Sequence, residues 1–273
     1  MPALVEIPPI PIHDVTLTAH GYGEVPVDAS DARGREPLVD LVQMGLAGEN
    51  FYAISNGGNA PYRKRLDGSI SALLARKGIA EKLLEVNRFL EPYGAELYLW
   101  DAYRPIATQA GIWDFFARTY EAETPGIDHD TLQTLLRHYI SDPRAFHEQD
   151  PSTWPTHSTG AALDLTLRAS SDGTLLSMGA GFDQMDASAH TDFYERALLA
   201  GEVPPDDPRL LNRRLLYHAM GRGGFVNYPK EYWHYDCGNQ MAQWNRAKLF
   251  GAPLKPAWYG YTPLPDGTAR DKT

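Results

Sequence analysis

Residues 156–167 read THSTGAALDLTL, the pattern of a buried strand with one charged residue inside it. Side chains alternate between the two faces of a sheet, so the three leucines at the end of this segment would share one face. Asp164 would then lie on the opposite face, where a buried carboxylate needs a positive or hydrogen-bonding partner. His157 lies before Gly160, where the chain can bend sharply, so a loop histidine and a strand carboxylate can converge on one point.

A second segment, residues 228–236, reads YPKEYWHYD and brings another histidine close to a carboxylate. Pro229 favours a loop up to about Glu231, so we expect a strand to begin there. In one regular strand Glu231 and His234 would point to opposite faces. A bend at the start of the strand would let Glu231 reach the site that His234 faces.

Together, His157, Asp164 and His234 supply three ligands of the nitrogen and oxygen types that zinc prefers. A fourth position would remain for water, as catalytic zinc requires, and Glu231 would be the general base for that water. The helical His-Glu-x-x-His zinc motif is absent from the sequence, so the geometry would differ from that motif. Each residue taken singly has an ordinary alternative as a surface or core histidine, or as a carboxylate in a salt bridge within the fold.

The composition is that of a folded globular protein, with 273 residues, 43% apolar residues and 22% charged residues. The net charge of -10 disfavours nucleic acid and anionic membranes as partners. No stretch approaches the roughly 18 apolar residues of a membrane span, and the N-terminus has no basic leader. The single cysteine, Cys237, cannot form an intramolecular disulfide, which fits a reducing compartment. We therefore expect a cytoplasmic protein.

Periodicity along the chain predicts both helices and strands. Helices are expected within 71–93, from about Ile106, and in two pieces over 189–220; strands are expected over 96–103, 161–167, 223–228 and 232–236, with two further strand candidates at Val15–Thr18 and 38–46. This order favours an α+β fold over repeated βαβ units. We expect an irregular N-terminal arm at 1–36, one domain at 37–260 with an insertion at about 121–150, and a C-terminal tail at 261–273.

Four segments resemble the signatures of the zinc D-alanyl-D-alanine dipeptidase family, and they occur in the family's order. They are His157-Ser158-Thr159-Gly160-Ala161-Ala162-Leu163-Asp164, Glu231-Tyr232-Trp233-His234, Trp100-Asp101-Ala102-Tyr103-Arg104-Pro105 and Met178-Gly179-Ala180-Gly181-Phe182-Asp183. The resemblance implies the Hedgehog/D,D-peptidase-like zinc fold, with a central, mostly antiparallel sheet and flanking helices. It also implies one Zn²⁺ per chain on His157, Asp164 and His234, with Glu231 as the base.

The resemblance implies further roles for three residues of the substrate pocket. Arg104 would stabilise the developing oxyanion or hold the substrate carboxylate, and Asp183 would bind the free ammonium group of a dipeptide. The ordinary alternatives are a salt bridge between Arg104 and Asp101, and a turn or cap for Asp183. Pro155 stands where the family has a serine, which puts strict preference for D-Ala in doubt, and the adjacent Thr156 is expected to contact substrate.

The implied activity is hydrolysis of D-Ala-D-Ala or similar small D-amino-acid dipeptides by attack of metal-bound water, in cell-wall metabolism. Two alternatives stay open at this point. One is a peptidoglycan D,D- or L,D-carboxypeptidase or endopeptidase. The other is a non-catalytic zinc-binding module similar to the Hedgehog domain, although such a module would not need the base or the arginine.

Overall fold

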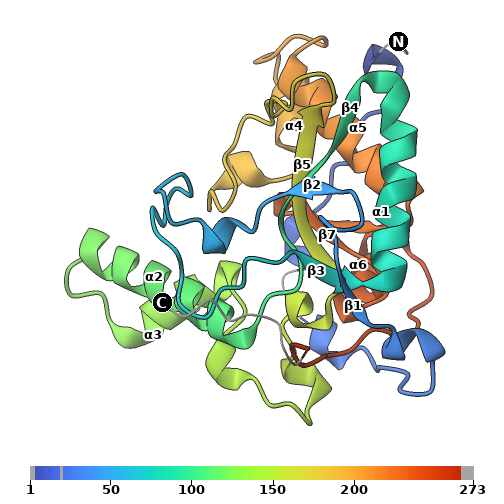
Figure 1. Ribbon diagram of the computed structural model, residues 1–273. Coiled ribbons are helices and arrows are strands. Elements are labelled where there is room, and N and C mark those ends of the chain that lie inside the picture. Colours follow the sequence, from blue (N-terminus) through green and yellow to red (C-terminus); the bar gives the residue numbers. More distant parts are fainter. Residues whose placement is uncertain (1–3, 19–20, 266–273) are drawn as a thin grey trace.

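The computed structural model describes residues 4–18 and 21–265, and within them five strands form a central sheet (Figure 1). The strand order is β2 (Ala47–Gly48), β4 (Ala95–Asp101), β5 (Ala162–Ala169), β7 (Glu231–Asp236) and β6 (Val226–Tyr228). Neighbouring strands are antiparallel except β2 and β4, which are parallel. The α+β prediction and the mostly antiparallel sheet are therefore confirmed.

Helices flank this sheet on more than one side (Figure 1). Those in contact with the strands include α1 (Lys77–Leu90), α5 (Pro208–Arg222) and α6 (Gln240–Phe250). The helices α2 (Ile106–Glu123) and α3 (His129–Tyr139) pack on each other apart from α1, and α4 (Phe193–Leu199) lies against α5. A separate antiparallel pair joins β1 (Leu38–Asp40) to β3 (Leu74–Arg76).

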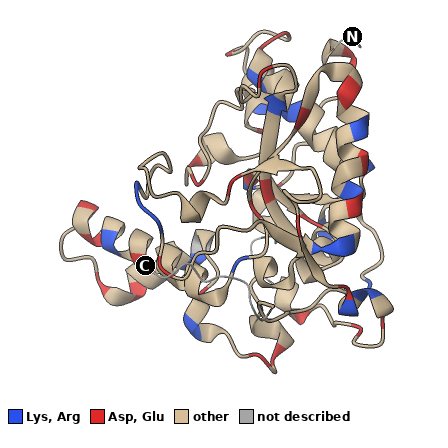
Figure 2. Cartoon of the chain, viewed as in Figure 1, with Lys and Arg blue, Asp and Glu red and all other residues tan. Residues whose placement is uncertain are grey.

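Burial follows the periodicity of the sequence in the elements that carry the core. In α1 the buried residues Ile79, Leu83, Val86 and Leu90 recur at helical spacing, and blue and red segments alternate along the rest of the helix in Figure 2. In β4 every second residue from Ala95 is buried, as expected for a strand with one face toward the core. The hydrophobic effect of these two faces packing together fixes α1 on the sheet.

A β-bulge interrupts the pairing of β4 with β5 near the end of β4. Leu99 pairs with Leu165, but Asp101 pairs with Asp164, so two residues of β4 lie opposite one residue of β5. In a regular strand the Asp101 side chain would point to the same face as Leu99, but the bulge turns it to the opposite face. As a result, its carboxylate lies on the same face of the sheet as Asp164, where it contacts Arg104.

Two expectations for the first part of the chain are wrong. Val15–Thr18 forms a 3-10 helix (η2) rather than a strand. Only Leu38–Asp40 of the expected strand over 38–46 is extended, because the Asp40 carboxylate accepts hydrogen bonds from the next backbone N–H groups and starts a turn. The helix expected within 71–93 is confirmed as Lys77–Leu90, and the residues before it, Leu74–Arg76, form a strand that pairs with β1.

The other expected elements are present with boundaries shifted by a few residues. The expected strand over 223–228 is observed as Val226–Tyr228, and the helical pattern of the insertion at 121–150 forms α3. Within the described residues, no helix has the length and apolar character needed to cross a bilayer. The division into arm, domain and tail stays a prediction, and residues 1–3 and 19–20 of that arm and 266–273 of that tail lie outside the described residues.

Candidate metal centre

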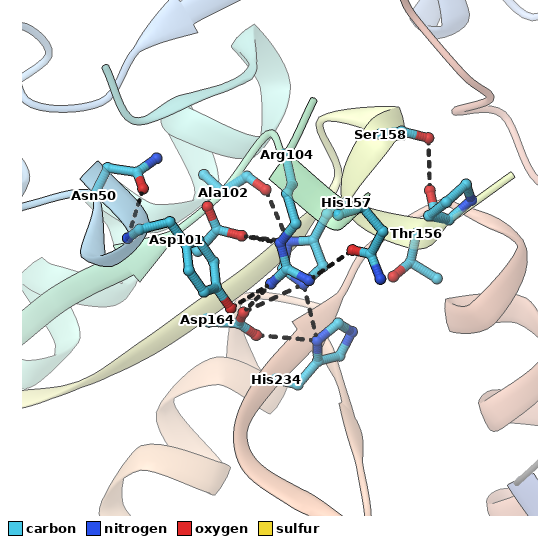
Figure 3. Close-up of polar contacts among 12 residues, drawn as sticks. Asn50, Asp101, Ala102, Arg104, Thr156, His157, Ser158, Asp164 and His234 are labelled. Atoms are coloured by element: carbon cyan, nitrogen blue, oxygen red, sulfur yellow. Dashed lines mark hydrogen bonds and ion pairs between the residues drawn. The ribbon is translucent and has the colours of Figure 1, made fainter. Parts of the chain in front are cut away.

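The residues expected to bind zinc converge in the structure (Figure 3). Asp164 on β5 pairs directly with His234 on β7, and His157 approaches them from the short 3-10 helix η9 (Thr156–Thr159). His234 Nδ1 lies 3.1 Å from Asp164 Oδ1 and 3.2 Å from His157 Nε2, and His157 Nε2 lies 3.4 Å from Asp164 Oδ2. All three side chains are buried, so this triad is a cluster of potential ligands shielded from solvent.

The second nitrogen of each imidazole ring has a hydrogen-bond partner that fixes the ring. His157 Nδ1 lies 2.8 Å from the carbonyl oxygen of Ala102, and His234 Nε2 lies 2.9 Å from Asp236 Oδ2. Because carbonyl and carboxylate oxygens only accept, each imidazole must donate its proton there. His157 Nε2 and His234 Nδ1 then present lone pairs to each other and to the Asp164 carboxylate.

This arrangement fits a divalent cation. Three hydrogen-bond acceptors that face one another at 3.1–3.4 Å repel unless a proton or a cation lies between them. Two imidazoles and one carboxylate are the ligands of many catalytic zinc sites. Burial alone would lower the pKa of His234, but Asp236 and Asp164 raise it well above its ordinary value, which is a further sign of a strongly cation-attracting site.

Gly160 allows the 3-10 helix η9, which carries His157, to turn sharply into β5. Gly160 ends η9 with φ of 69°, in the left-handed region that disfavours other residues. A Cβ there would lie 2.4 Å from Leu38 Cδ2. The turn is also held by a hydrogen bond from the backbone N–H of Arg104 to the carbonyl oxygen of His157. This brings the expected arginine next to the metal ligands.

The guanidinium of Arg104 has several partners at the centre of the site. Its Nη2 donates to Asp164 Oδ2 at 2.9 Å and to the Tyr52 hydroxyl at 3.1 Å. Its Nε donates to Asp101 Oδ2 at 2.7 Å, and its Nη1 donates to Gln109 Oε1 at 3.0 Å. The expected alternative of a salt bridge with Asp101 therefore exists, but it orients the guanidinium toward the metal ligands rather than away from them.

Asp183 lies in the same pocket, where it accepts hydrogen bonds from two tyrosines. Its Oδ2 is 3.0 Å from the Tyr52 hydroxyl and 2.8 Å from the Tyr62 hydroxyl. Its φ of 57° is unusual for a residue other than glycine. Burial raises the pKa of the Asp183 carboxyl to about 7, although Arg104 opposes this shift. Asp183 is thus a pocket residue, and it also lies in a turn, as the alternative expected.

Glu231 reaches the metal site from the first position of β7. Its Oε2 lies 3.7 Å from His234 Nδ1. The pairing of β6 with β7 shifts register between Asn227 and Tyr228, opposite Glu231, so the strand is irregular where the bend was expected. Burial raises the pKa of the Glu231 carboxyl to about 8. A bound cation would lower this pKa, because it favours the charged carboxylate.

The site opens into a pocket of about 330 Å³. Its walls include Arg104, Asp183, Glu231 and the triad, and also Pro155 and Thr156. All the residues that the sequence analysis assigned to ligands, base and substrate therefore line one cavity.

Four residues of the site were not found from the sequence. Asp236 and His234 are two residues apart on β7, so side-chain alternation puts them on the same face of the sheet. This alternation could have indicated Asp236 from the sequence. Asp101 was noted only as a salt-bridge partner. Tyr52 and Tyr62 lie in an irregular segment without periodicity, and nothing local to them pointed to the site.

A family model described as D-ala-D-ala dipeptidase matches residues 36–249. A D-alanyl-D-alanine dipeptidase of Synechocystis sp. is 30% identical over 206 residues, which cover 70% of this chain and 79% of that protein. A D-alanyl-D-alanine dipeptidase of Streptomyces coelicolor is 34% identical over 175 residues, covering 63% of this chain and 77% of that protein.

Among solved structures, a mutant of the vancomycin resistance D,D-pentapeptidase VanY in complex with Zn(II) matches with 17% identity and a TM-score of 0.34. That match covers 71% of this chain and 89% of the other. VanYB in complex with D-alanine-D-alanine matches with 16% identity and a TM-score of 0.35, covering 71% and 88%.

Proposed function

Because this chain belongs to the D-Ala-D-Ala dipeptidase family of peptidases, we propose that it is a zinc peptidase that hydrolyses D-Ala-D-Ala or a similar small D-amino-acid dipeptide. The observation that carries the proposal is the buried triad of His157, Asp164 and His234 with a carboxylate and a guanidinium beside it. A purely structural zinc site would need neither of these two extra groups.

In the proposed site, His157 Nε2, His234 Nδ1 and the Asp164 carboxylate hold the metal. The chemistry that zinc supplies when bound in such a site is polarisation of a carbonyl group and a lowered pKa of water. Ala102 and Asp236 keep the two imidazoles in the tautomers that leave the ligand nitrogens unprotonated.

Glu231 acts as the proton carrier. Its carboxylate accepts a proton from the attacking water and then delivers it to the nitrogen of the departing amino acid. Its place 3.7 Å from His234 Nδ1 supports this role, since a water between the ligands and the carboxylate would be within reach of both. Burial raises the pKa of Glu231 and a bound cation lowers it, and a carboxyl group balanced between these two effects can both accept and release the proton.

Arg104 stabilises the negative charge that develops on the carbonyl oxygen. A guanidinium oriented by Asp101 and Gln109 needs no reorganisation when that charge appears, which is the basis of electrostatic catalysis. Its hydrogen bond to Asp164, a proposed metal ligand, supports a role at the reacting carbonyl over a role at the end of the substrate.

Asp183 binds the ammonium group of the dipeptide. A single buried carboxylate that receives two tyrosine hydroxyls can pair with one cation, and an N-acylated peptide would leave it unpaired. This arrangement would restrict the enzyme to substrates with a free amino terminus, in contrast to a carboxypeptidase acting on long peptides.

The substitution Glu231→Gln tests the proposal. The variant should keep its zinc and its fold but lose at least about 100-fold in kcat on D-Ala-D-Ala, because it cannot accept the proton. Retention of zinc, measured by elemental analysis, separates loss of the base from loss of the metal. Wild-type turnover in this variant would refute the role of Glu231.

A panel of D,D-, L,D- and L,L-dipeptides and a D-Ala-D-Ala-terminated pentapeptide, assayed with and without chelator, tests the substrate. Cleavage of the pentapeptide in preference to the dipeptides would favour a carboxypeptidase instead. Zinc bound without any hydrolysis would favour a binding module. We also propose a cytoplasmic location and a part in cell-wall metabolism, and cell fractionation with activity in the cytoplasmic fraction is the measurement that checks the location.

A further inference from the structure

The substrate that the proposed function assigns has a carboxylate at its other end, and this end has no partner so far. Of the described residues that line the pocket, two carry a permanent positive charge, Arg104 and Arg137. The guanidinium of Arg104 already donates to Asp101, Gln109, Tyr52 and Asp164. Arg137 is therefore the remaining permanent cation in this lining that can meet a substrate carboxylate.

Arg137 lies on α3, in the inserted part of the chain, and its bond to Asp142 does not use all the N–H groups of its guanidinium. Its Nη2 donates to Asp142 Oδ2 at 3.0 Å, and its side chain is 56% exposed. Arg144 binds the same carboxylate more closely, with Nε 2.8 Å from Asp142 Oδ1 and Nη2 2.7 Å from Asp142 Oδ2. Because Arg144 holds both oxygens of Asp142, Arg137 can exchange its bond to this carboxylate for a bond to another anion.

The hydroxyl groups of Tyr22 and Ser141 also line the pocket, and Ser141 is next in sequence to Asp142, which Arg137 binds. The Tyr22 hydroxyl, in the 3-10 helix η3 (Tyr22–Glu24), makes long contacts of 3.3 Å to Ser141 Oγ and 3.4 Å to the Trp154 carbonyl oxygen. Bonds of this length can be exchanged for a shorter bond to a charged oxygen. Thr156 also lines the pocket, two residues after Trp154, whereas Pro155 offers no donor.

Two segments that are distant in sequence form this part of the pocket, the N-terminal arm with Tyr22 and the insertion with Arg137 and Ser141. Tyr22 lies before the segment matched by the family model, which begins at residue 36, and Gln240 holds the arm in place by donating to the carbonyl oxygens of Gly23 and Val25. Asp183 contacts the hydroxyl groups of Tyr52 and Tyr62, whereas the Tyr22 hydroxyl contacts Ser141 and Trp154, so the ammonium site and these hydroxyl groups belong to separate clusters of the pocket.

We propose that Arg137, with the hydroxyl groups of Tyr22 and Ser141, forms the subsite that recognises the free carboxylate of the residue released by hydrolysis. The pocket then carries a negative group at the Asp183 end and a positive group at the Arg137 end. This charge pattern complements a zwitterionic dipeptide, and it makes both the arm and the insertion parts of the specificity site.

The test compares D-Ala-D-Ala with its C-terminal amide, which lacks the negative charge. The wild-type enzyme should prefer the acid, and Arg137→Gln should lower kcat/KM for the acid about tenfold, mainly through KM, while changing the value for the amide less than about twofold. Arg144→Gln is the matched control, because it removes the other guanidinium on Asp142 without changing a pocket residue. It should leave the acid-to-amide ratio as in the wild type.

Tyr22→Phe provides an independent measurement in the arm. It should raise KM for the acid about threefold to tenfold with little change in kcat or in the value for the amide. An unchanged acid-to-amide ratio in Arg137→Gln, or an equal fall in that ratio in Arg144→Gln, would overturn the subsite. Since every ratio is measured within one variant, a loss of stability cannot imitate it. If the wild-type enzyme hydrolyses neither compound, the proposed function itself fails.

Discussion

Replacing Asp236 by asparagine is expected to weaken zinc binding by about 10- to 100-fold while leaving the three proposed ligands unchanged. The Asp236 side chain is fully buried, and its Oδ2 accepts the proton of His234 Nε2 at 2.9 Å. Its Oδ1 accepts from Asn239 Nδ2 at 2.5 Å. The carboxylate thus satisfies two donors at once, which a neutral amide of the same shape cannot do.

In the Asp236→Asn variant, one of the two donors must face the new NH₂ group. If the amide oxygen stays on Asn239, the NH₂ group points at His234 Nε2 and favours the tautomer with the proton on Nδ1. That tautomer blocks the nitrogen that faces the metal. A hydrogen bond to a charged group is worth about 1.5–3 kcal/mol, which corresponds to about 10- to 150-fold in affinity.

The assay is competition for zinc between the protein and a chromogenic chelator, together with thermal unfolding of the metal-free protein. Asp207→Asn is the matched control, because Asp207 is also a buried aspartate and caps the start of α5 by accepting from Arg209. The control should retain the wild-type zinc affinity. Equal zinc affinity in Asp236→Asn and the wild type would refute the argument that Asp236 fixes the His234 tautomer.

Three further predictions concern the ammonium site, the turn and the metal. The pKa of Asp183 is raised to about 7, so its carboxylate form is lost as the pH falls through 7. KM for D-Ala-D-Ala should therefore rise below pH 7. A KM that stays constant between pH 6 and 8 would contradict this. Gly160→Ala should lower the free energy of unfolding by about 2 kcal/mol or more. The loss should exceed that of the control Gly201→Ala, where φ is similar but no atom lies within 4 Å of the added Cβ. Equal losses in denaturant titrations would exclude a role for the Leu38 contact. Adding zinc to chelator-treated protein at 100 times its dissociation constant should stabilise the fold by about 2.7 kcal/mol, seen as a rise in Tm of about 5 °C or more, and an unchanged Tm would mean that no zinc binds to the native triad.

The ligand triad could be predicted from the sequence because each part of it rests on a local pattern. Alternation placed Asp164 opposite the leucines of its strand, and in the structure it pairs with His234 on the next strand. The resemblance to the dipeptidase family is confirmed by the match over residues 36–249. The bend that lets Glu231 approach His234 was expected from Pro229 and is observed as a register shift.

The residues that escaped prediction act through tertiary contacts. Tyr52 and Tyr62 converge on Asp183 from an irregular segment whose path depends on packing rather than on local propensity. Tyr22 reaches the pocket only because the arm packs on α6 and on the segment around Trp154. The strand Leu74–Arg76 was not predicted either, because it depends on pairing with β1, which is distant in sequence.

The bulge in β4 has a consequence for how closely the two halves of the site are connected. A regular strand would space two residues of one face by about 7 Å, yet here the neighbours Trp100 and Asp101 both serve the face that carries Asp164. Trp100 stacks on Phe182, the residue before Asp183, whereas Asp101 lies 3.4 Å from His157 Nδ1. One peptide bond therefore joins Trp100, which packs beside the substrate-binding loop, to Asp101, which contacts a metal ligand. Exchanging the loop around Asp183 for another sequence would for this reason also change the affinity for the metal ion.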